Sequence, residues 1–466
     1  MSYLHGDDRE QGPVLDDYVG PEALVRVIDA FVGAMDFAGL GFERSVPAST
    51  GRPGYDPRDL LRLYLYGYLN EVRSSRRLER ECRRNIEMMS LLGRLAPDFK
   101  TIADFRRDNS PALVGACRAF VLFCRDQGLI GGRTVAIDGS KFRAAASPRR
   151  IMGRREIDKI SARIDARVAE YLAKLDEADA QKAEPADTSQ VRSALETLKS
   201  RAAALEAMRA ALDESGRSTV VQGEIDARPM GVGAARKPPS YNLQAAVDTG
   251  TSLILHHDVT TEATDNRLLH PVAKEAKQVL RAARLRVVAD AGYSNGAQAA
   301  ACEHEGIEPC VPANRAINNT GDFFDRRAFL YDAENDIYTC PGGRTLVRKE
   351  VLPAKHIVRY AARDCSGCPL KPRCTSGSRR SLKRHLHDDA LQRMNARVVA
   401  DPGLMRLRRA TAEHPFGTIK RMSGGGRFLT RGLDKVRGEA ALSVLAYNMI
   451  RAITLLGART LATRLT

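Results

Sequence analysis

Three acidic residues, far apart in the sequence, stand where carboxylates can carry out metal-dependent chemistry. Asp138 and Asp290 each follow a short apolar run that is typical of a buried strand, and Glu413 lies in a strongly helical stretch. The strand ends of an open α/β sheet face the ligand crevice, so two carboxylates there can converge. Carboxylates that pack together repel each other unless a divalent cation neutralises them, and Mg²⁺ or Mn²⁺ prefers oxygen ligands. Two such ions can activate a nucleophile and stabilise a leaving oxygen in phosphodiester chemistry.

Each aspartate alone also has a plainer interpretation, as a turn residue or a helix cap. The helical stretch supports the chemical interpretation, because its spacing places Arg406, Arg409 and Lys420 on the same helix face as Glu413. This pattern predicts a metal-binding carboxylate flanked by cations that bind the phosphates beside the reacting bond. The alternative is an Arg–Glu pair on a solvated face, which stabilises a helix only slightly. Pro415 can kink this helix, which weakens the argument for Lys420.

A second cluster of charges predicts a DNA-contacting helix in the N-terminal region. Six arginines recur at helical spacing and share one face, and Leu78, Cys82, Ile86 and Met89 form a different, apolar face. Such a helix suits contact with a phosphate backbone or a groove. The alternative is a solvated face on which neighbouring glutamates neutralise part of the charge. The arginines are Arg73, Arg76, Arg77, Arg80, Arg83 and Arg84.

Four cysteines predict a structural zinc site in the second half of the chain. Cys340, Cys365, Cys368 and Cys374 have the spacing C-x24-C-x2-C-x5-C, and two ligands on a knuckle with two further thiols suit tetrahedral zinc. Two alternatives are a redox-active C-x2-C pair, for which no thioredoxin-like context exists, and four reduced thiols in a DNA-contacting lobe.

The composition favours a polyanionic partner inside a reducing compartment. The 466 residues include 73 Lys and Arg against 57 Asp and Glu, a net charge of +16, so nucleic acid is the expected partner. No uninterrupted apolar run reaches the roughly 18 residues of a membrane span, and the start of the chain has no secretion signal. Nine cysteines, an odd number, argue against a disulfide scaffold. We therefore expect a cytoplasmic protein associated with the nucleoid, without contact with a membrane.

The elements that must position these residues change in type along the chain. The apolar spacing of the first 130 residues predicts helices only, and Asp56 is expected to be an N-cap before Pro57. After 131–132 the chain predicts an α/β alternation. Strands are expected at 134–137, 241–247, 253–260, 285–289 and near 309–311, and helices at about 110–128, 266–283 and 296–304.

Two insertions interrupt the alternation. Apolar residues at steps of three and four over 157–175 and 191–212 predict an antiparallel helical hairpin. The second insertion is rich in arginine and holds the four cysteines. The expected organisation is a loose tail (1–20), a helical DNA-binding domain (21–130), an α/β catalytic core (131–312 and 401–460), a hairpin insertion (150–215) and a basic, Cys-rich insertion (313–400).

Six sequence blocks together resemble a known family. The three acidic blocks, VAIDGSKFRA, VADAGY and EHPFGTIK, look like those of insertion-sequence transposases of the DDE group, most closely the 1182 family of these bacterial mobile elements. The similarity extends to YDPRDLL, TIADFRR and LDKVRG, so it spans nearly the whole chain. The blocks occupy residues 135–144, 288–293, 413–420, 55–61, 101–107 and 433–438.

The resemblance implies an RNase H-like catalytic core in which Asp138, Asp290 and Glu413 are catalytic and bind two Mg²⁺ or Mn²⁺ ions. Arg409 and Lys420 match the R-x3-E-x6-K pattern of the group, and both are DNA-binding candidates. Lys141, in the first acidic block, is another. Arg406 stands where many members of the group have a tyrosine.

The expected function is therefore transposition of DNA: metal-dependent cleavage at the element's inverted-repeat ends, then strand transfer into target DNA. Joining two ends requires two active sites, so a homodimer or a higher assembly on DNA is expected. No nucleotide cofactor is expected, because the glycine run at 424–426 lacks the features of a P-loop. One alternative is an RNase H-like metal-dependent nuclease without strand transfer. The other is a non-catalytic, zinc-stabilised DNA-binding protein from a decayed element.

Overall fold

The N-terminal region is built from short helices whose ends carry local capping signals. The structure, a computed structural model, describes residues 15–47, 54–180, 185–231, 237–313 and 323–466, so most of the predicted tail lies outside the described residues. Asp56 caps its helix as predicted, accepting a hydrogen bond from the backbone N–H of Arg58 at 2.8 Å. The helices are α1 (Leu24–Gly33), α2 (Pro57–Leu69), α3 (Ser75–Glu81), α4 (Ile86–Leu91), α5 (Phe99–Asp108) and α6 (Ser110–Asp126).

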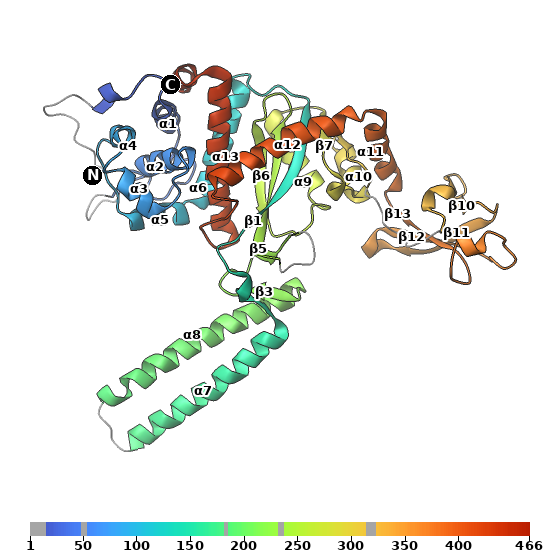
Figure 1. Ribbon diagram of the computed structural model, residues 1–466, viewed down its shortest axis with the longest axis horizontal. Helices are drawn as coiled ribbons and strands as arrows, with labels where there is room; N and C mark the ends of the chain where they lie inside the picture. Colours follow the sequence, from blue (N-terminus) through green and yellow to red (C-terminus); the bar gives the residue numbers. More distant parts are fainter. Residues whose placement is uncertain (1–14, 48–53, 181–184, 232–236, 314–322) are drawn as a thin grey trace.

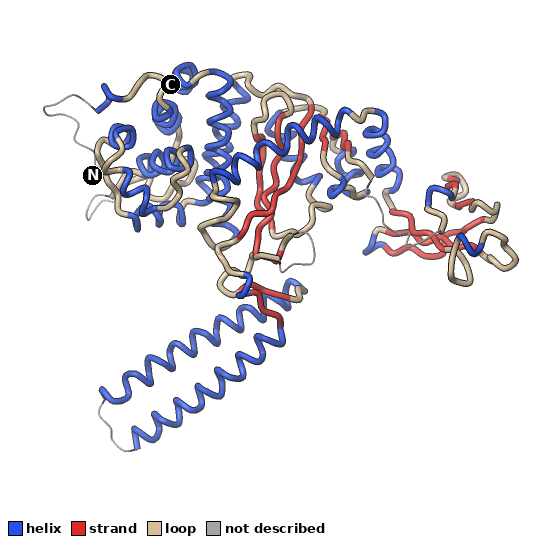
Figure 2. Tube along the Cα trace, viewed as in Figure 1, coloured by secondary structure: helices blue, strands red, loops and turns tan. Residues whose placement is uncertain are grey.

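A mixed β-sheet forms the centre of the molecule, as the α/β pattern predicts (Figure 2). The order is β4-β5-β1-β7-β8, and β6 also pairs with β5. β1 is antiparallel to β5 and parallel to β7, and β7 is parallel to β8. The strands are β1 (Thr134–Arg143), β4 (Arg228–Pro229), β5 (Pro239–Asp248), β6 (Ile254–Thr260), β7 (Leu285–Val288) and β8 (Ile307–Cys310).

Helices cover both faces of this sheet, and alternation along β1 assigns side chains to the two faces. Val135 and Ile137 belong to the main hydrophobic core, which also includes α9 (Leu269–Leu280). Ala136 packs in a separate cluster with Val288 and with Ala412 of α12 (Gly403–Met422). Figure 1 shows α12 crossing the sheet. The remaining helices of this part are α10 (Gly296–His304), α11 (Asp388–Ala400), α13 (Leu433–Leu456) and α14 (Ala458–Leu465).

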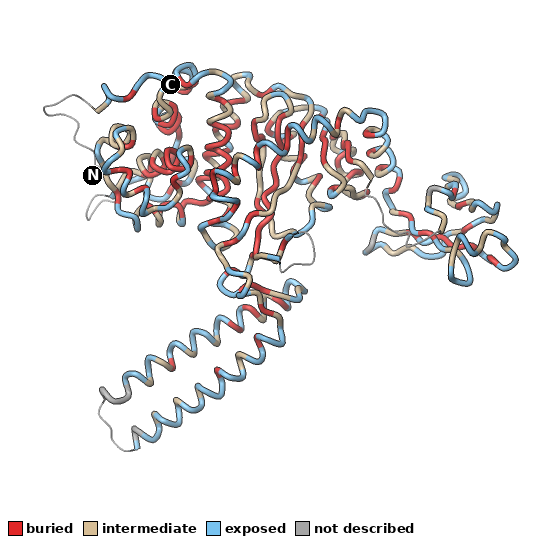
Figure 3. The backbone as a smooth tube through the Cα atoms, in the orientation of Figure 1, coloured by how far each residue is buried: buried red, intermediate tan, exposed pale blue. Residues whose placement is uncertain are grey.

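Helix α13 joins the N-terminal helices to the sheet. It packs on β6, as expected for a helix that covers the sheet, and it also contacts α2 and α6 of the N-terminal region. By length and composition alone α13 could cross a membrane, but 67% of its most apolar segment is buried inside the protein. In Figure 3 buried segments recur in the N-terminal helices, in α13 and in the sheet, and residues of all three belong to one hydrophobic core. The apolar composition of α13 is therefore that of a helix buried in a protein core.

Two projections extend from this body (Figure 1). The two helices expected in the first insertion are present, α7 (Arg154–Ala180) and α8 (Pro185–Ser215). They share an apolar cluster, and the short strands β2 (Ile151–Gly153) and β3 (Thr219–Val221) pair at their base. The second projection is an antiparallel sheet with its own small core. Its strands are β9 (Leu330–Asp332), β10 (Ile337–Thr339), β11 (Thr345–Leu352), β12 (Ile357–Ala362) and β13 (Ser381–His385).

Candidate active site

Asp138 lies inside strand β1, and not beyond its end as the sequence indicated. β1 continues to Arg143 because β5 pairs with it over that whole length. The parallel pairing of β1 with β7, by contrast, ends at Ala136. Asp138 therefore stands two residues past the parallel part of the sheet, on the same strand face as Ala136, which is covered by α12.

Asp290 and Glu413 reach the same region from two other elements. Asp290 follows β7 by two residues, as predicted, and caps a short 3₁₀ helix by accepting from the backbone N–H of Gly292 at 2.8 Å. Oδ1 of Asp290 therefore acts as a helix cap, as one interpretation of the sequence predicts. Oδ2 of Asp290 faces Arg408 of α12. Glu413 directly follows Ala412, which is buried against β1 and β7, and α12 continues through Pro415 to Met422.

The three carboxylates meet around one side chain, Arg408. Its guanidinium lies 2.8 Å from Asp138 Oδ1, 3.4 Å from Asp290 Oδ2 and 3.8 Å from Glu413 Oε1. Sequence reasoning missed Arg408, because its spacing from Glu413 does not belong to the pattern of Arg409 and Lys420. One signal was available: Arg408 is four residues after Leu404 and four before Ala412, so it shares their sheet-facing side of α12.

Burial affects the protonation of Asp138. Desolvation raises the pKa of Asp138 to about 6, and the Asp290 carboxylate adds to the rise, while Arg408 and the backbone N–H of Gly139 oppose it. The exposed fraction of the side chain is 15% for Asp138, 48% for Asp290 and 60% for Glu413. Asp138 is thus shielded from solvent, whereas Glu413 is accessible. A polymeric substrate can therefore approach the site from the side of Glu413.

A polar network lies beside Gly139, on the face of β1 opposite to Asp138. Asp265 accepts hydrogen bonds from Asn242 at 2.7 Å and from Gln244 at 2.8 Å, and it forms an ion pair with Lys141 at 3.0 Å. Tyr293 is buried and donates to Gln244, so it contributes to the core. Lys141, a DNA-binding candidate, is therefore paired with Asp265 on that opposite face of β1.

The other cations predicted on α12 differ in their surroundings. Arg406 and Arg409 are exposed, and neither has a carboxylate within ion-pair distance among the described residues. Lys420 lies two turns from Glu413, with its ammonium 5.8 Å from the centre of the Phe142 ring. The backbone of Gly425 and Gly426, both at positive φ, folds back to bond the Lys420 carbonyl, so this end of α12 is fixed beside the end of β1.

The prediction that the six arginines share one face of a single helix is wrong. α3 ends at Glu81, and Asn85 caps α4 by accepting from the backbone N–H of Met88, so the chain turns between them. Arg73 precedes α3 and points into the protein, where it pairs with buried Glu439 at 3.1 Å. Arg76, Arg77 and Arg80 therefore lie on α3, whereas Arg83 and Arg84 lie in the turn after it and α4 carries no arginine.

The other five arginines of the cluster are exposed. Arg83 and Arg84 pair with glutamates one turn earlier, at 3.5 and 2.6 Å. Arg76, Arg77 and Arg80 have no carboxylate within ion-pair distance among the residues described. Ile86 is exposed, which corrects the predicted apolar face. These three arginines of α3 form the part of the cluster that is free to meet phosphates.

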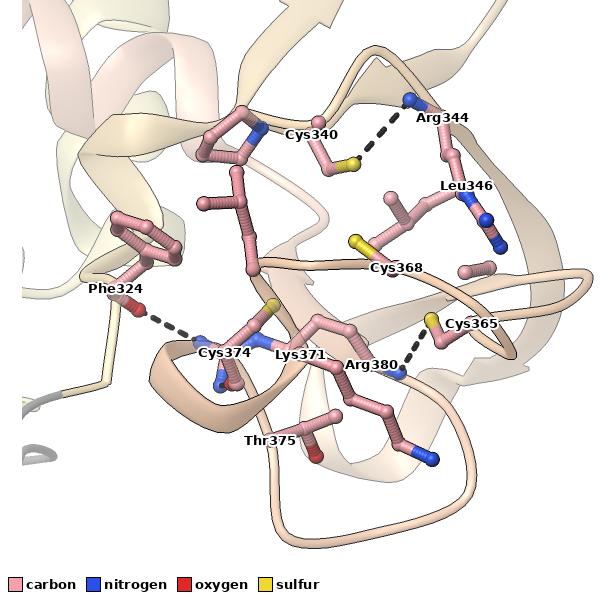
Figure 4. A pocket seen from close by; sticks show the side chains of 14 residues that line it. Phe324, Cys340, Arg344, Leu346, Cys365, Cys368, Lys371, Cys374, Thr375 and Arg380 are labelled. Atoms are coloured by element: carbon pink, nitrogen blue, oxygen red, sulfur yellow. Dashed lines mark hydrogen bonds between the residues drawn. The ribbon is translucent and has the colours of Figure 1, made fainter.

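The four predicted zinc ligands line one hollow in the β9–β13 lobe (Figure 4). The backbone N–H of Arg344 donates to Cys340 Sγ at 3.3 Å, and that of Arg380 donates to Cys365 Sγ at 3.5 Å. Burial raises the pKa of Cys374, and the other three thiols add to the rise. All nine cysteines are unpaired by disulfides, and the five outside this lobe are buried.

Within the described ranges, no group of three His, Cys, Asp or Glu side chains is arranged to hold a metal ion. At the three carboxylates the Arg408 guanidinium occupies the contacts that a cation would make. In the cysteine lobe the thiols share a hollow but remain spread around it. Both sets supply the donor atoms of a metal site, oxygen in one and sulfur in the other.

Two family models match separate parts of the chain. Residues 13–108 match a family model described as a transposase domain (DUF772), and residues 339–453 match one described as a transposase DDE domain. The second match includes Glu413 and the four cysteines of the lobe, whereas Asp138 and Asp290 lie outside both. No curated protein and no solved structure matches the chain.

The two matched domains define a DNA transposase, an enzyme that transfers polynucleotide strands. More particularly, the chain is an insertion-sequence transposase of the DDE type.

Proposed function

We propose that this transposase cuts DNA at the ends of its element and joins the freed 3′-hydroxyls to target DNA at a site made by Asp138, Asp290 and Glu413. The convergence of these three carboxylates on one guanidinium is the observation that carries the proposal. A mixed sheet covered by helices on both faces supports an RNase H-like core. The acidic blocks support membership in the 1182 family.

The carboxylates suit divalent cations. Their oxygens are hard donors, and the buried Asp138 beside Asp290 favours a compensating positive charge. Two Mg²⁺ or Mn²⁺ ions held by the three acids would activate the attacking oxygen and stabilise the leaving one. The N–H groups of Gly139 and Gly292 orient two of the acids by hydrogen bonds of 2.8 Å.

Basic residues around the acids have a separate role, which is to hold the DNA strand. Arg409 is exposed one turn before Glu413, so its guanidinium can donate two hydrogen bonds to a phosphate. Lys420, fixed beside the end of β1, would contact a phosphate further along the strand. Lys141 would act through its position next to Asp265.

The proposed reaction implies the partners. Each strand transfer joins two DNA ends, so two active sites must come together, and we infer a dimer or a higher assembly on DNA. Cleavage by water is energetically downhill, and strand transfer breaks one phosphodiester bond as it forms another, so no nucleotide cofactor is required. The DNA substrate implies work at the nucleoid in the cytoplasm.

Strand transfer with pre-cleaved end DNA and a target plasmid tests the function. The wild-type protein with Mg²⁺ or Mn²⁺ should give joined product. Asp138→Asn, Asp290→Asn and Glu413→Gln should each lower the rate at least ~100-fold, as expected when a group that stabilises the transition state is lost. Gel-shift binding of end DNA should persist in each variant.

Asp434→Asn is the matched control, because Asp434 is 91% exposed at the start of α13 and should tolerate the same change. Joining by the Asp138 variant at the wild-type rate would refute the site. Hydrolysis without joining in the wild type would instead indicate a nuclease, and neither product would indicate a DNA-binding protein without catalysis.

We also propose that Cys340, Cys365, Cys368 and Cys374 hold a structural Zn²⁺ ion. Four thiols around one hollow match the donor set of a structural zinc site, and backbone N–H groups already donate to two of the sulfurs. Purified full-length protein should contain about one zinc per chain. Cys365→Ser with Cys368→Ser should remove the zinc, and Cys124→Ala, in a buried helix, should keep it. Wild-type protein free of zinc would end the proposal.

A further inference from the structure

The position of Arg408 singles it out among the basic residues of α12. Its side chain is 13% exposed, and its Nε has no hydrogen-bond partner within the described part of the chain. Leu404 and Ala412, one turn before and one turn after it, pack against β1 and β7. Arg408 therefore points from α12 into the carboxylates, whereas Arg406 and Arg409 point outward.

The contacts of Arg408 differ from those of an ordinary ion pair. One guanidinium faces three carboxylates from three different elements, at 2.8, 3.4 and 3.8 Å. A single positive charge cannot neutralise three negative ones, so the cluster as it stands keeps an excess of negative charge. The contacted oxygens of Asp138, Asp290 and Glu413 are also the donors that the proposed function assigns to divalent cations.

We propose that Arg408 is a displaceable counter-cation: its guanidinium and the divalent cations compete for the same carboxylate oxygens. This inference rests on the proposed function of the three acids. Removing a competitor raises the apparent affinity of the other ligand, because no binding free energy is then spent on displacing it. Arg408 thereby keeps the acids together before cations bind, and it sets the cation concentration at which the site fills.

The competition between Arg408 and divalent cations also implies that Arg408 stabilises the protein when no cation is bound. Among the residues that the structure describes, Arg408 is the cation within ion-pair distance of all three acids, so its loss leaves their mutual repulsion uncompensated. Arg408→Gln should therefore lower the melting temperature of chelator-treated protein. Saturating Mn²⁺ should raise the melting temperature of this variant by more than it raises that of the wild type.

Calorimetric titration of Mn²⁺ into chelator-treated full-length protein tests the competition. Arg408→Gln should bind Mn²⁺ about 10-fold more tightly than the wild type, a size common for coupling between two ligands. Arg408→Lys keeps a positive charge for folding and should bind Mn²⁺ with an affinity between the two. Arg406→Gln is the matched control, because it makes the same change of charge two residues away on the exposed side of α12, and its affinity should equal that of the wild type.

Asp138→Asn separates the inference from the function on which it rests. Suppose that Asp138→Asn loses Mn²⁺ affinity while Arg408→Gln binds Mn²⁺ no more tightly than the wild type. The proposed competition between Arg408 and the cations is then overturned, and the proposed metal site is retained. If Asp138→Asn binds Mn²⁺ like the wild type, the proposed metal site itself is overturned, and the role of Arg408 falls with it. A purely structural role of Arg408 would lower stability and leave the Mn²⁺ affinity unchanged, which also contradicts the competition.

Discussion

The properties of individual residues in this transposase depend on what surrounds them more than on their type. Asp138 and Asp434 are both aspartates, yet burial raises the pKa of the first to about 6, while the second is 91% exposed. Arg408 and Arg409 are neighbours in sequence, yet one faces three carboxylates and the other faces solvent. The surroundings of Asp138 and Arg408 therefore follow from packing, which holds these two side chains largely away from water.

The stability of the protein at acid pH is expected to depend on His257, a residue of β6. Desolvation lowers its pKa to about 3, and His256 adds to the effect. The unfolded chain, with a histidine pKa near 6.5, binds this proton first, so stability is complete above about pH 6.5 and falls as the pH drops towards 3. His257→Gln should reduce this acid loss by up to about 1.4 kcal/mol per pH unit.

Urea unfolding of full-length protein between pH 4 and pH 8 measures the effect. At pH 8 the histidine is neutral in the folded and the unfolded chain, so that measurement isolates the packing cost of the substitution. A pH dependence identical to that of the wild type would show that His257 does not titrate differently on folding.

At the scale of elements, the site depends on where one strand changes partners and on which helix crosses it. β1 pairs with β5 along its whole length but with β7 only at its start, so Asp138 stands at the point where β7 leaves the sheet. α12 brings Glu413 and Arg408 to that point by packing Ala412 on Ala136 and Val288. The contacts of one helix with two strands thus place both the third acid and its counter-cation.

Helix α3 gives the prediction at the scale of elements. Arg76 and Arg80 are exposed on it, four residues apart, and can meet the phosphate backbone together. Arg76→Glu with Arg80→Glu should weaken binding to end DNA and lower the slope of log affinity against log salt by about one per arginine. Arg192→Glu with Arg201→Glu, on exposed positions of α8, makes the same change of charge as a control. Equal losses in both double variants would indicate a general effect of charge and not a contact made by α3.

The whole molecule is held together by contacts between segments hundreds of residues apart. α13 packs on the N-terminal helices and on the sheet, and one hydrophobic core includes residues of both. Within that core Arg73 pairs with Glu439, which is fully buried and also accepts from the backbone N–H groups of Leu429 and Thr430. The helical region is thereby fixed to the part of the chain that carries the acids.

This buried pair gives the prediction for the whole molecule. Glu439→Gln leaves the Arg73 charge without its carboxylate partner, so the free energy of unfolding should fall by roughly 3–5 kcal/mol. Glu71→Gln removes a partner of Arg421 in another pair between the same regions, but both side chains are largely exposed, so the cost should stay below about 1 kcal/mol. Denaturant unfolding of the full chain compares the two variants. A loss as small for Glu439 as for Glu71 would mean that the core does not depend on the pair.

Local patterns predicted much of this protein. Apolar periodicity predicted most of the helices and strands of the core, with α10 at the predicted residues 296–304. Capping chemistry predicted the start of α2 at Pro57, and the order of the acidic blocks predicted an insertion-sequence transposase of the DDE type. These features follow from interactions between residues close in sequence, or from the identity of residues whose chemistry permits few substitutes.

Other features were decided by tertiary structure. No periodicity distinguishes Arg73 from Arg76, but Arg73 pairs with Glu439, more than 360 residues away, whereas Arg76 is exposed and lies over the Phe99 ring. The continuation of β1 past Asp138 depends on β5, and the role of Arg408 depends on two strands and a helix that meet only in the folded chain. Burial and long-range pairing act between residues that the fold brings together, so the sequence alone could name the acids but not the arginine between them.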